Sequence, residues 1–237
     1  MRLKPLLLVL PLLCVAVLLA NEISIQNLSM PMFDEAGRLT KTLTADSANG
    51  PYAHPILKNG LVTFHTALAE KITPGATLAF EEAVYDKIGA FVEGPGAIRF
   101  ASASGDLSGV GFHHDLASGR LKLYRDVRAL IKGVNIQGQK ADALILENPA
   151  DRAWVITEAI ITGPVVATDV VLDKVRFDKV ETDRATYSRA DGTLTLASPV
   201  TGWIKGEKTV LGGQLIQIKT GEPAPAPAVP APAPLHP

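Results

Sequence analysis

The sequence has one cysteine, few aromatic residues and almost no net charge. A single Cys among 237 residues excludes an internal disulfide framework and a zinc site built from cysteines. Lys and Arg number 23 against 24 Asp and Glu, and this balance argues against binding to bare nucleic acid, which needs a concentrated positive patch. Five histidines are a poor supply for metal or acid–base chemistry. We therefore expect no enzyme activity, no metal and no cofactor.

Glycine and proline, in contrast, are plentiful. The chain has 20 Gly and 17 Pro, and 47% of its residues are hydrophobic, which is the composition of a folded chain with many short elements joined by turns. No serine lies in a Gly-x-Ser-x-Gly setting, and no glycine cluster has the spacing of a nucleotide site. The His113-His114 doublet is not expected to chelate a metal, because successive strand side chains point to opposite faces.

The N-terminal residues form an apolar segment. Every residue from Pro5 to Ala20 is apolar or proline, and Arg2 and Lys4 precede the run. Residues 1–22 are therefore predicted to be a membrane anchor or a cleaved signal, with the rest of the chain exported. An anchor is favoured, because Leu18 occupies a position where a cleavage site after Ala20 needs a small residue.

The C-terminal residues have a different bias. Residues 222–237 contain seven prolines and five alanines, a composition that cannot bury a core and is typical of an extended, disordered tail. Residues 23–221 remain as the folding domain, with enough length for a sizeable core.

Within this domain the hydrophobic period is two. Between Gly119 and Gly133 five apolar residues fall at odd positions, with Arg125 as the one break, so an amphipathic strand pair is predicted there: Leu121, Leu123, Val127, Ala129 and Ile131. The residues from Val165 to Asp191 lack Gly and Pro but are rich in valine, and strands are preferred for them over a helix. The same alternation continues at Leu194, Leu196, Val200, Gly202 and Ile204.

The strands also repeat. Tyr85, His114 and Tyr187 each stand in a short polar segment. An apolar residue follows seven positions later and another thirteen positions later. A strand–turn–strand unit cannot bury its apolar face alone, so the units are expected to stack around one apolar interior, with the first and last strands unpaired. The apolar residues seven positions after the three anchors are Val92, Leu121 and Leu194. Those thirteen positions after them are Ile98, Val127 and Val200.

Two patterns resemble a known family. Phe33-Asp34-x-x-Gly37-x-Leu39 followed by Leu43-Thr44-Ala45, after one apolar segment, is similar to the start of LptC proteins. The units Asp106–Val127 and Asp183–Val200 resemble the OstA/LptA-type repeat. The resemblance implies an all-β, bent β-jellyroll of stacked antiparallel repeats after one N-terminal apolar helix. It also implies an inner-membrane, single-pass protein with its β-domain in the periplasm.

The resemblance further implies a role in lipopolysaccharide transport. The inner face would shield acyl chains between an inner-membrane ABC transporter and a downstream periplasmic OstA/LptA-type bridge protein. Alternatives are a soluble, periplasmic LptA-like bridge and an exported β-solenoid scaffold that binds protein partners without lipid. The predicted lipid-binding residues, which are ordinary core in the simplest interpretation, are Val92, Ile98, Phe100, Leu121, Leu123, Val127, Ile131, Leu194, Leu196, Val200 and Ile204.

A partner strand is predicted at the end of the domain. The segment Gly212–Lys219, just before the Pro-Ala tail, shows an imperfect alternation of apolar and polar residues, and an unpaired edge there could accept a strand from a neighbouring protein. Its predicted partner-binding residues are Leu215, Ile216 and Ile218. Lys122, Arg125, Arg128 and Lys132 could meet lipid phosphates at a groove rim, although a solvated face is the simpler interpretation.

Overall fold

A computed structural model describes residues 22–68, 71–172, 174–197, 199–211 and 216–219. Every element of regular secondary structure in these ranges is a β-strand, so the predicted all-β class is confirmed. The predicted apolar helix and the Pro-Ala tail lie outside the described residues. Within the described ranges, no helix has the length and hydrophobicity needed to cross a membrane.

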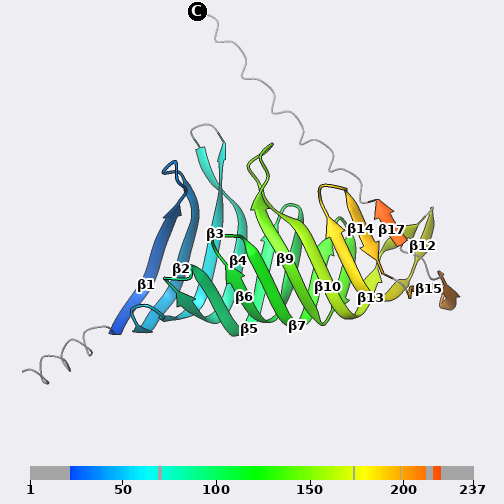
Figure 1. Ribbon diagram of the computed structural model, residues 1–237, viewed down its shortest axis with the longest axis horizontal. Helices are drawn as coiled ribbons and strands as arrows, with labels where there is room; N and C mark the ends of the chain where they lie inside the picture. Colours follow the sequence, from blue (N-terminus) through cyan, green and yellow to red (C-terminus); the bar gives the residue numbers. More distant parts are fainter. Residues whose placement is uncertain (1–21, 69–70, 173, 198, 212–215, 220–237) are drawn as a thin grey trace, which may run out of the picture.

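The strands follow one another closely along the chain (Figure 1). Their bounds are β1 (Glu22–Phe33), β2 (Leu39–Pro51), β3 (Ile56–Leu68), β4 (Lys71–Asp86), β5 (Phe91–Ser102), β6 (Gly105–Asp115), β7 (Arg120–Ile131), β8 (Val134–Gly138), β9 (Lys140–Glu147), β10 (Trp154–Thr168), β11 (Val170–Leu172), β12 (Val175–Phe177), β13 (Lys179–Ser188), β14 (Thr193–Leu196), β15 (Thr201–Ile204), β16 (Glu207–Val210) and β17 (Ile216–Lys219).

Fifteen of these strands form a single antiparallel sheet. Each strand from β1 to β7 pairs with the next one along the chain, and β8 and β9 both lie between β7 and β10. The sheet then continues through β13 to β14 and β17, with β15 and β16 as a branch, while β11 and β12 pair only with each other. Among the described strands, β1 and β17 stand at the two ends of the main path of the sheet, as the repeat pattern predicts, and β16 ends the branch.

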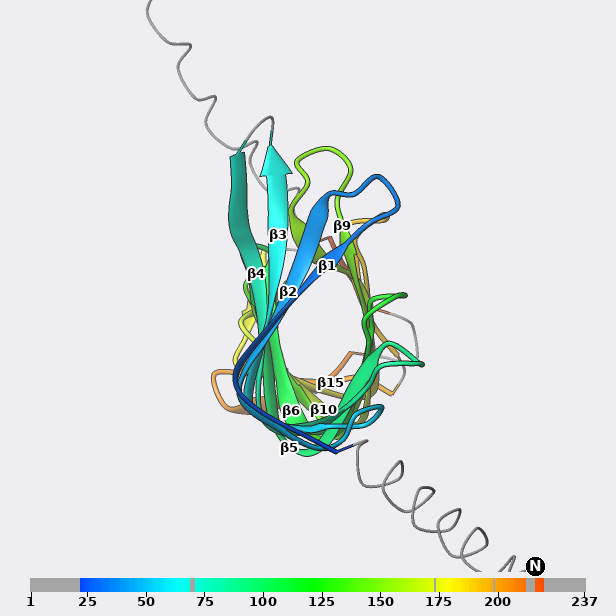
Figure 2. The same cartoon turned by 90° about the vertical axis from the view of Figure 1, so that its left-hand side faces the viewer.

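The sheet folds over along a crease that crosses the middle of its long strands. The register shifts there in several pairs, for example between Ser108 and Val110 of β6, and Asn59 and Asp126 adopt positive φ angles of 50° and 52°. β8 pairs with the second half of β7 and β9 with its first half, so together they replace one bent strand. Seen along the stack, the strands curve into two facing walls (Figure 2).

We call these walls arm I and arm II, and the side opposite the crease the mouth. Arm I comprises residues 28–33, 39–45, 60–68, 71–80, 97–102, 105–109, 127–131, 134–138, 165–168, 179–182 and 201–204. Arm II comprises residues 22–26, 47–51, 56–58, 84–86, 91–94, 110–115, 120–125, 140–147, 154–162, 184–188, 193–196 and 216–219.

The predicted strand pair at residues 119–133 is in fact one bent strand. β7 spans Arg120–Ile131 without a turn, and Asp126 and Val127 of β7 stand opposite the single residue Gly109 of β6 where the register shifts. This bulge turns Arg125 outward although it occupies an inward position of the alternation. The break in the sequence pattern therefore marks the crease and not a hairpin loop. Within Val165–Asp191, strands are confirmed for most of the described residues, as the end of β10 and the whole of β11, β12 and β13.

The sequence repeat corresponds to a hairpin in the sheet. Tyr85 pairs directly with Val92, His114 with Leu121, and Tyr187 with Leu194. The spacing of seven is therefore the distance across a tight turn in arm II, and Ile98 and Val127, at thirteen, lie beyond the crease in arm I. One expectation is wrong: the three anchor residues are buried rather than placed in polar segments, because they face the other arm.

Candidate lipid-binding site

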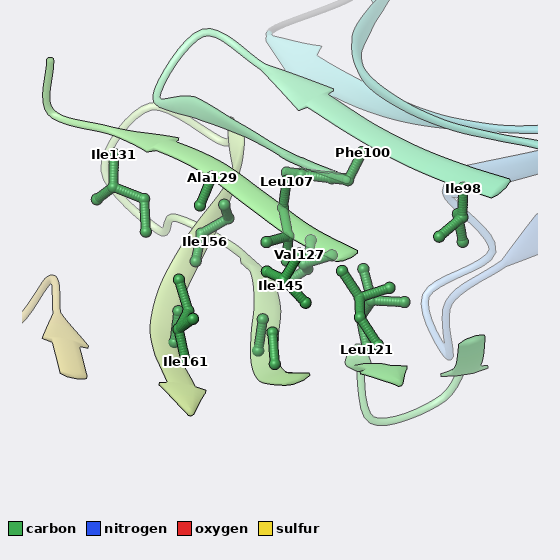
Figure 3. Packing of buried hydrophobic residues seen from close by; sticks show 14 of the residues in the cluster. Ile98, Phe100, Leu107, Leu121, Val127, Ala129, Ile131, Ile145, Ile156 and Ile161 are labelled. Atoms are coloured by element: carbon green, nitrogen blue, oxygen red, sulfur yellow. The ribbon is translucent and has the colours of Figure 1, made fainter. Parts of the chain in front are cut away.

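The predicted lipid-binding residues lie inside the fold. Ten of the eleven are at most 3% exposed, and Ile204 is half-buried and packs against them. They come from both arms, and the labelled side chains in Figure 3, among them Leu121 of arm II and Phe100 of arm I, reach into a common interior. The alternation in the sequence therefore identifies the inward face correctly.

This interior is filled by its own side chains. Phe64, Phe100 and Phe112 are among the largest fully buried residues, and the rings of Phe64 and Phe100 meet edge to face with centroids 5.9 Å apart. A chain with so few aromatic residues could leave an open groove, but five of its phenylalanines are buried here: Phe64, Phe80, Phe100, Phe112 and Phe177. An acyl chain could enter only if the two arms separated.

The mouth is bridged by side chains from both arms. Lys41 of β2 donates a hydrogen bond from Nζ to the carbonyl oxygen of Leu116, which follows β6. The indole Nε1 of Trp154 in β10 donates to the carbonyl oxygen of His65 in β3, at 3.1 Å. The first contact joins arm I to the turn that follows β6 in arm II, and the second joins arm II to arm I. They act as two latches that hold the mouth closed.

The residues around these latches form what we call the mouth cluster: Lys41, Phe64, His114 and Trp154. The Lys41 amine lies 4.9 Å from the ring centroid of Trp154 and 5.8 Å from that of Phe64, in cation–π geometry. The Phe64 ring lies 5.0 Å from that of Trp154 and 6.2 Å from that of His114. Side chains from three other strands thus meet around Phe64 of β3.

Sequence reasoning missed this cluster, although one signal was present. Lys41 occupies the inward phase of β2, in register with Leu43 and Ala45, and its side chain is accordingly buried, with 7% exposed. A lysine in the inward phase of a strand is rare because burial of its charge is costly. Burial lowers the pKa of Lys41 to about 8, partly offset by the nearby Asp115 carboxylate.

The His113-His114 doublet divides between two environments. His113 contacts the carboxylate of Glu93, with Nδ1 at 3.2 Å, on the outside of the sheet. His114 is fully buried, its Nδ1 lies 3.3 Å from the carbonyl oxygen of Arg120, and its Nε2 has no hydrogen-bond partner among the described atoms. The expectation that the two rings face opposite ways is confirmed. Burial, with the positive charge of Lys41, lowers the pKa of His114 to about 4.

This burial predicts acid sensitivity. The folded pKa of His114 is about 4 against an ordinary value of 6.5, so the unfolded chain binds the proton more readily between these two pH values. The resulting stability is present above pH 6.5 and is lost as the pH falls towards 4. At 1.36 kcal/mol for each pKa unit, the loss is about 3 kcal/mol. Urea unfolding at pH 7 and pH 4.5 measures it.

The matched control is His114→Phe, which keeps a ring but cannot titrate. It should remove most of the loss over this pH range, whatever its effect at pH 7. If the variant loses as much stability as the parent between pH 7 and 4.5, other groups are responsible for the acid sensitivity.

Basic residues lie on the outer face. Lys122, Arg125 and Arg128 are exposed, and Lys132 is half-buried. Arg128 lines a pocket of about 660 Å³ along the crease, together with Arg99. In the sheet, Ser108 of β6 pairs with Arg99 of β5 on one side and with Arg128 of β7 on the other. These side chains therefore lie on the opposite side of the sheet from the interior and cannot line it.

The predicted partner strand is described only in part. β17 spans Ile216–Lys219 and pairs with β14 along one edge, leaving the other without a strand among the described residues. Ile218 is 7% exposed and faces the core, Leu215 lies outside the described residues, and the backbone of Ile216 lies in the strand. At the other end, the whole outer edge of β1 is open within the described sheet.

No protein-family model matches the chain, and no curated protein is significantly similar to it. The resemblance to LptC proteins therefore remains a prediction from the sequence motifs.

Proposed function

We propose that this protein is a component of a periplasmic lipid-transport bridge, whose two arms shield the acyl chains of lipopolysaccharide. The observation that carries the proposal is one apolar cluster running from Leu43 in β2 to Ile218 in β17, through the whole length of the folded sheet. Once the two arms separate, such an interior would give acyl chains a continuous path away from water.

The two ends of the sheet suit a bridge. β1 is 12 residues long, none of its residues is buried, and Leu28, Met30 and Met32 are only half-covered by the core beneath them. An open edge with a partly covered apolar face favours strand addition by a neighbouring sheet. In our proposal the membrane lies at the N-terminal end with an ABC transporter complex, and an OstA/LptA-type protein follows β17.

A second candidate is an exported β-scaffold that binds proteins through its edges and carries no lipid. The near-complete burial of the interior favours it, because a filled core needs no ligand. In either case the edges would serve association, so the two functions differ only in whether lipid enters between the arms.

Photocrosslinking from an inward and an outward position separates the two functions. Leu123 is 1% exposed and faces the interior, whereas its neighbour Lys122 is exposed on the same strand. With benzoylphenylalanine at each position and purified lipopolysaccharide, we expect a lipid adduct from position 123 and little from 122. Equal labelling, or none at 123, would favour the scaffold. The thermal unfolding of both variants must first confirm that they fold.

A further inference from the structure

The Lys41 latch holds a positive charge in an unfavourable place. Its amine is buried at the mouth, its acceptor is the neutral carbonyl oxygen of Leu116, and the rings of Phe64 and Trp154 lie beside it. The Asp115 carboxylate is near enough to act on its charge but forms no ion pair with it. Among the described residues no carboxylate lies within ion-pair distance of Lys41. A buried ammonium is much better stabilised by an anion than by a carbonyl group.

A second unsatisfied group belongs to the same cluster. Nδ1 of His114 faces the carbonyl oxygen of Arg120 and must carry the proton to make that hydrogen bond, so in the neutral ring Nε2 is an acceptor. That nitrogen is buried and has no partner among the described atoms. The mouth cluster therefore offers one cation and one free acceptor. The Lys41 amine lies 5.8 Å from the ring centroid of Phe64, and the ring centroid of His114 lies 6.2 Å from it.

We propose that Lys41 and His114 form a receptor for the headgroup of a phosphate monoester amphiphile whose acyl chain enters between the arms. An anionic oxygen of the phosphate would accept from the Lys41 amine, and a P–OH group would donate to Nε2 of His114. The inference rests on the proposed function, because the chain of the amphiphile needs the apolar interior.

Headgroup binding would also open one latch. The Lys41 amine would exchange the Leu116 carbonyl oxygen for a charged acceptor, which forms the stronger hydrogen bond. The hydrogen bond from Trp154 to His65 would then be the remaining cross-arm latch of the mouth cluster. Binding of the headgroup and separation of the arms are in this way one event.

Calorimetric titration of the full chain at pH 7 tests the receptor with three probes below their micelle concentrations: dodecyl phosphate, dodecanol and inorganic phosphate. We expect dodecyl phosphate to bind at least about tenfold more tightly than dodecanol, which corresponds to about 1.4 kcal/mol. Lys41→Met should remove this preference, and Lys122→Met, a change of an exposed lysine, should keep it. Thermal unfolding checks that Lys41→Met folds.

The outcomes separate this inference from the proposed function. If both amphiphiles bind equally, or Lys41→Met retains the preference, the receptor is wrong while lipid entry stands. Inorganic phosphate binding as tightly as dodecyl phosphate would indicate a site for free anions and would also overturn the receptor. If neither amphiphile binds the parent chain, both the receptor and the proposed function fail.

Discussion

Val127→Asp is expected to lower the free energy of unfolding by at least about 4 kcal/mol at pH 7. Val127 is 1% exposed at the start of the arm I half of β7, between side chains of both arms. The substitution removes the buried valine contacts and places a carboxyl group within the apolar cluster. The carboxyl group would take up a proton at raised pKa, so the loss should be smaller at pH 5 than at pH 7. Urea unfolding at the two pH values measures both effects.

The matched control is Arg128→Asp, one residue along the same strand on the exposed face. It should change stability by no more than about 0.5 kcal/mol. Because Val127→Asp could prevent folding altogether, Val127→Thr provides a milder variant with a smaller loss in the same direction. If Val127→Asp were as stable as its control, position 127 would be open to water, and the interior would not be closed at the crease.

Gly119→Ala should destabilise the protein by roughly 2 kcal/mol or more. Gly119 ends the turn between β6 and β7 with φ of 76°, a conformation that costs residues with a side chain about 1–2 kcal/mol. A Cβ atom there would also stand 2.1 Å from the carbonyl oxygen of Ile145, so the main chain of β9 would have to move. The same turn holds Leu116, the acceptor of the Lys41 latch.

Gly133→Ala separates the two contributions. Gly133 has φ of 82°, but nothing lies within 4 Å of an added Cβ atom, so only the conformational cost should remain. The difference between the two variants in thermal or urea unfolding gives the steric part. Equal losses would mean that the turn and β9 adjust freely, and that the close approach of Gly119 to Ile145 has no structural weight.

The local patterns of the sequence predict the interior well, because a two-residue period encodes which face of a strand is buried. The spacing from His114 to Leu121 likewise identifies a hairpin, because the two residues pair with each other across a single tight turn. The bend at Asp126 disturbs the pattern only at Arg125, so a crease and a loop look alike in the sequence.

The mouth cluster could not be predicted in the same way. Lys41 and Trp154 meet only because the sheet folds over, and nothing in either local sequence indicates the other. His114 was misplaced for the same reason: its neighbours in the chain are polar, while its neighbours in space belong to the opposite arm. Only the inward phase of Lys41 hinted at a buried charge.

The proposed function depends on lipid entering between the arms in the living cell, and the crosslinking pair tests this most directly there. Benzoylphenylalanine is placed at Leu123 or at Lys122 of the full chain, and cells are irradiated while lipopolysaccharide is being exported. We predict a lipopolysaccharide adduct from position 123 and none from position 122. Adducts from position 123 that contain only protein would contradict a lipid path through the interior and would leave the chain as a scaffold.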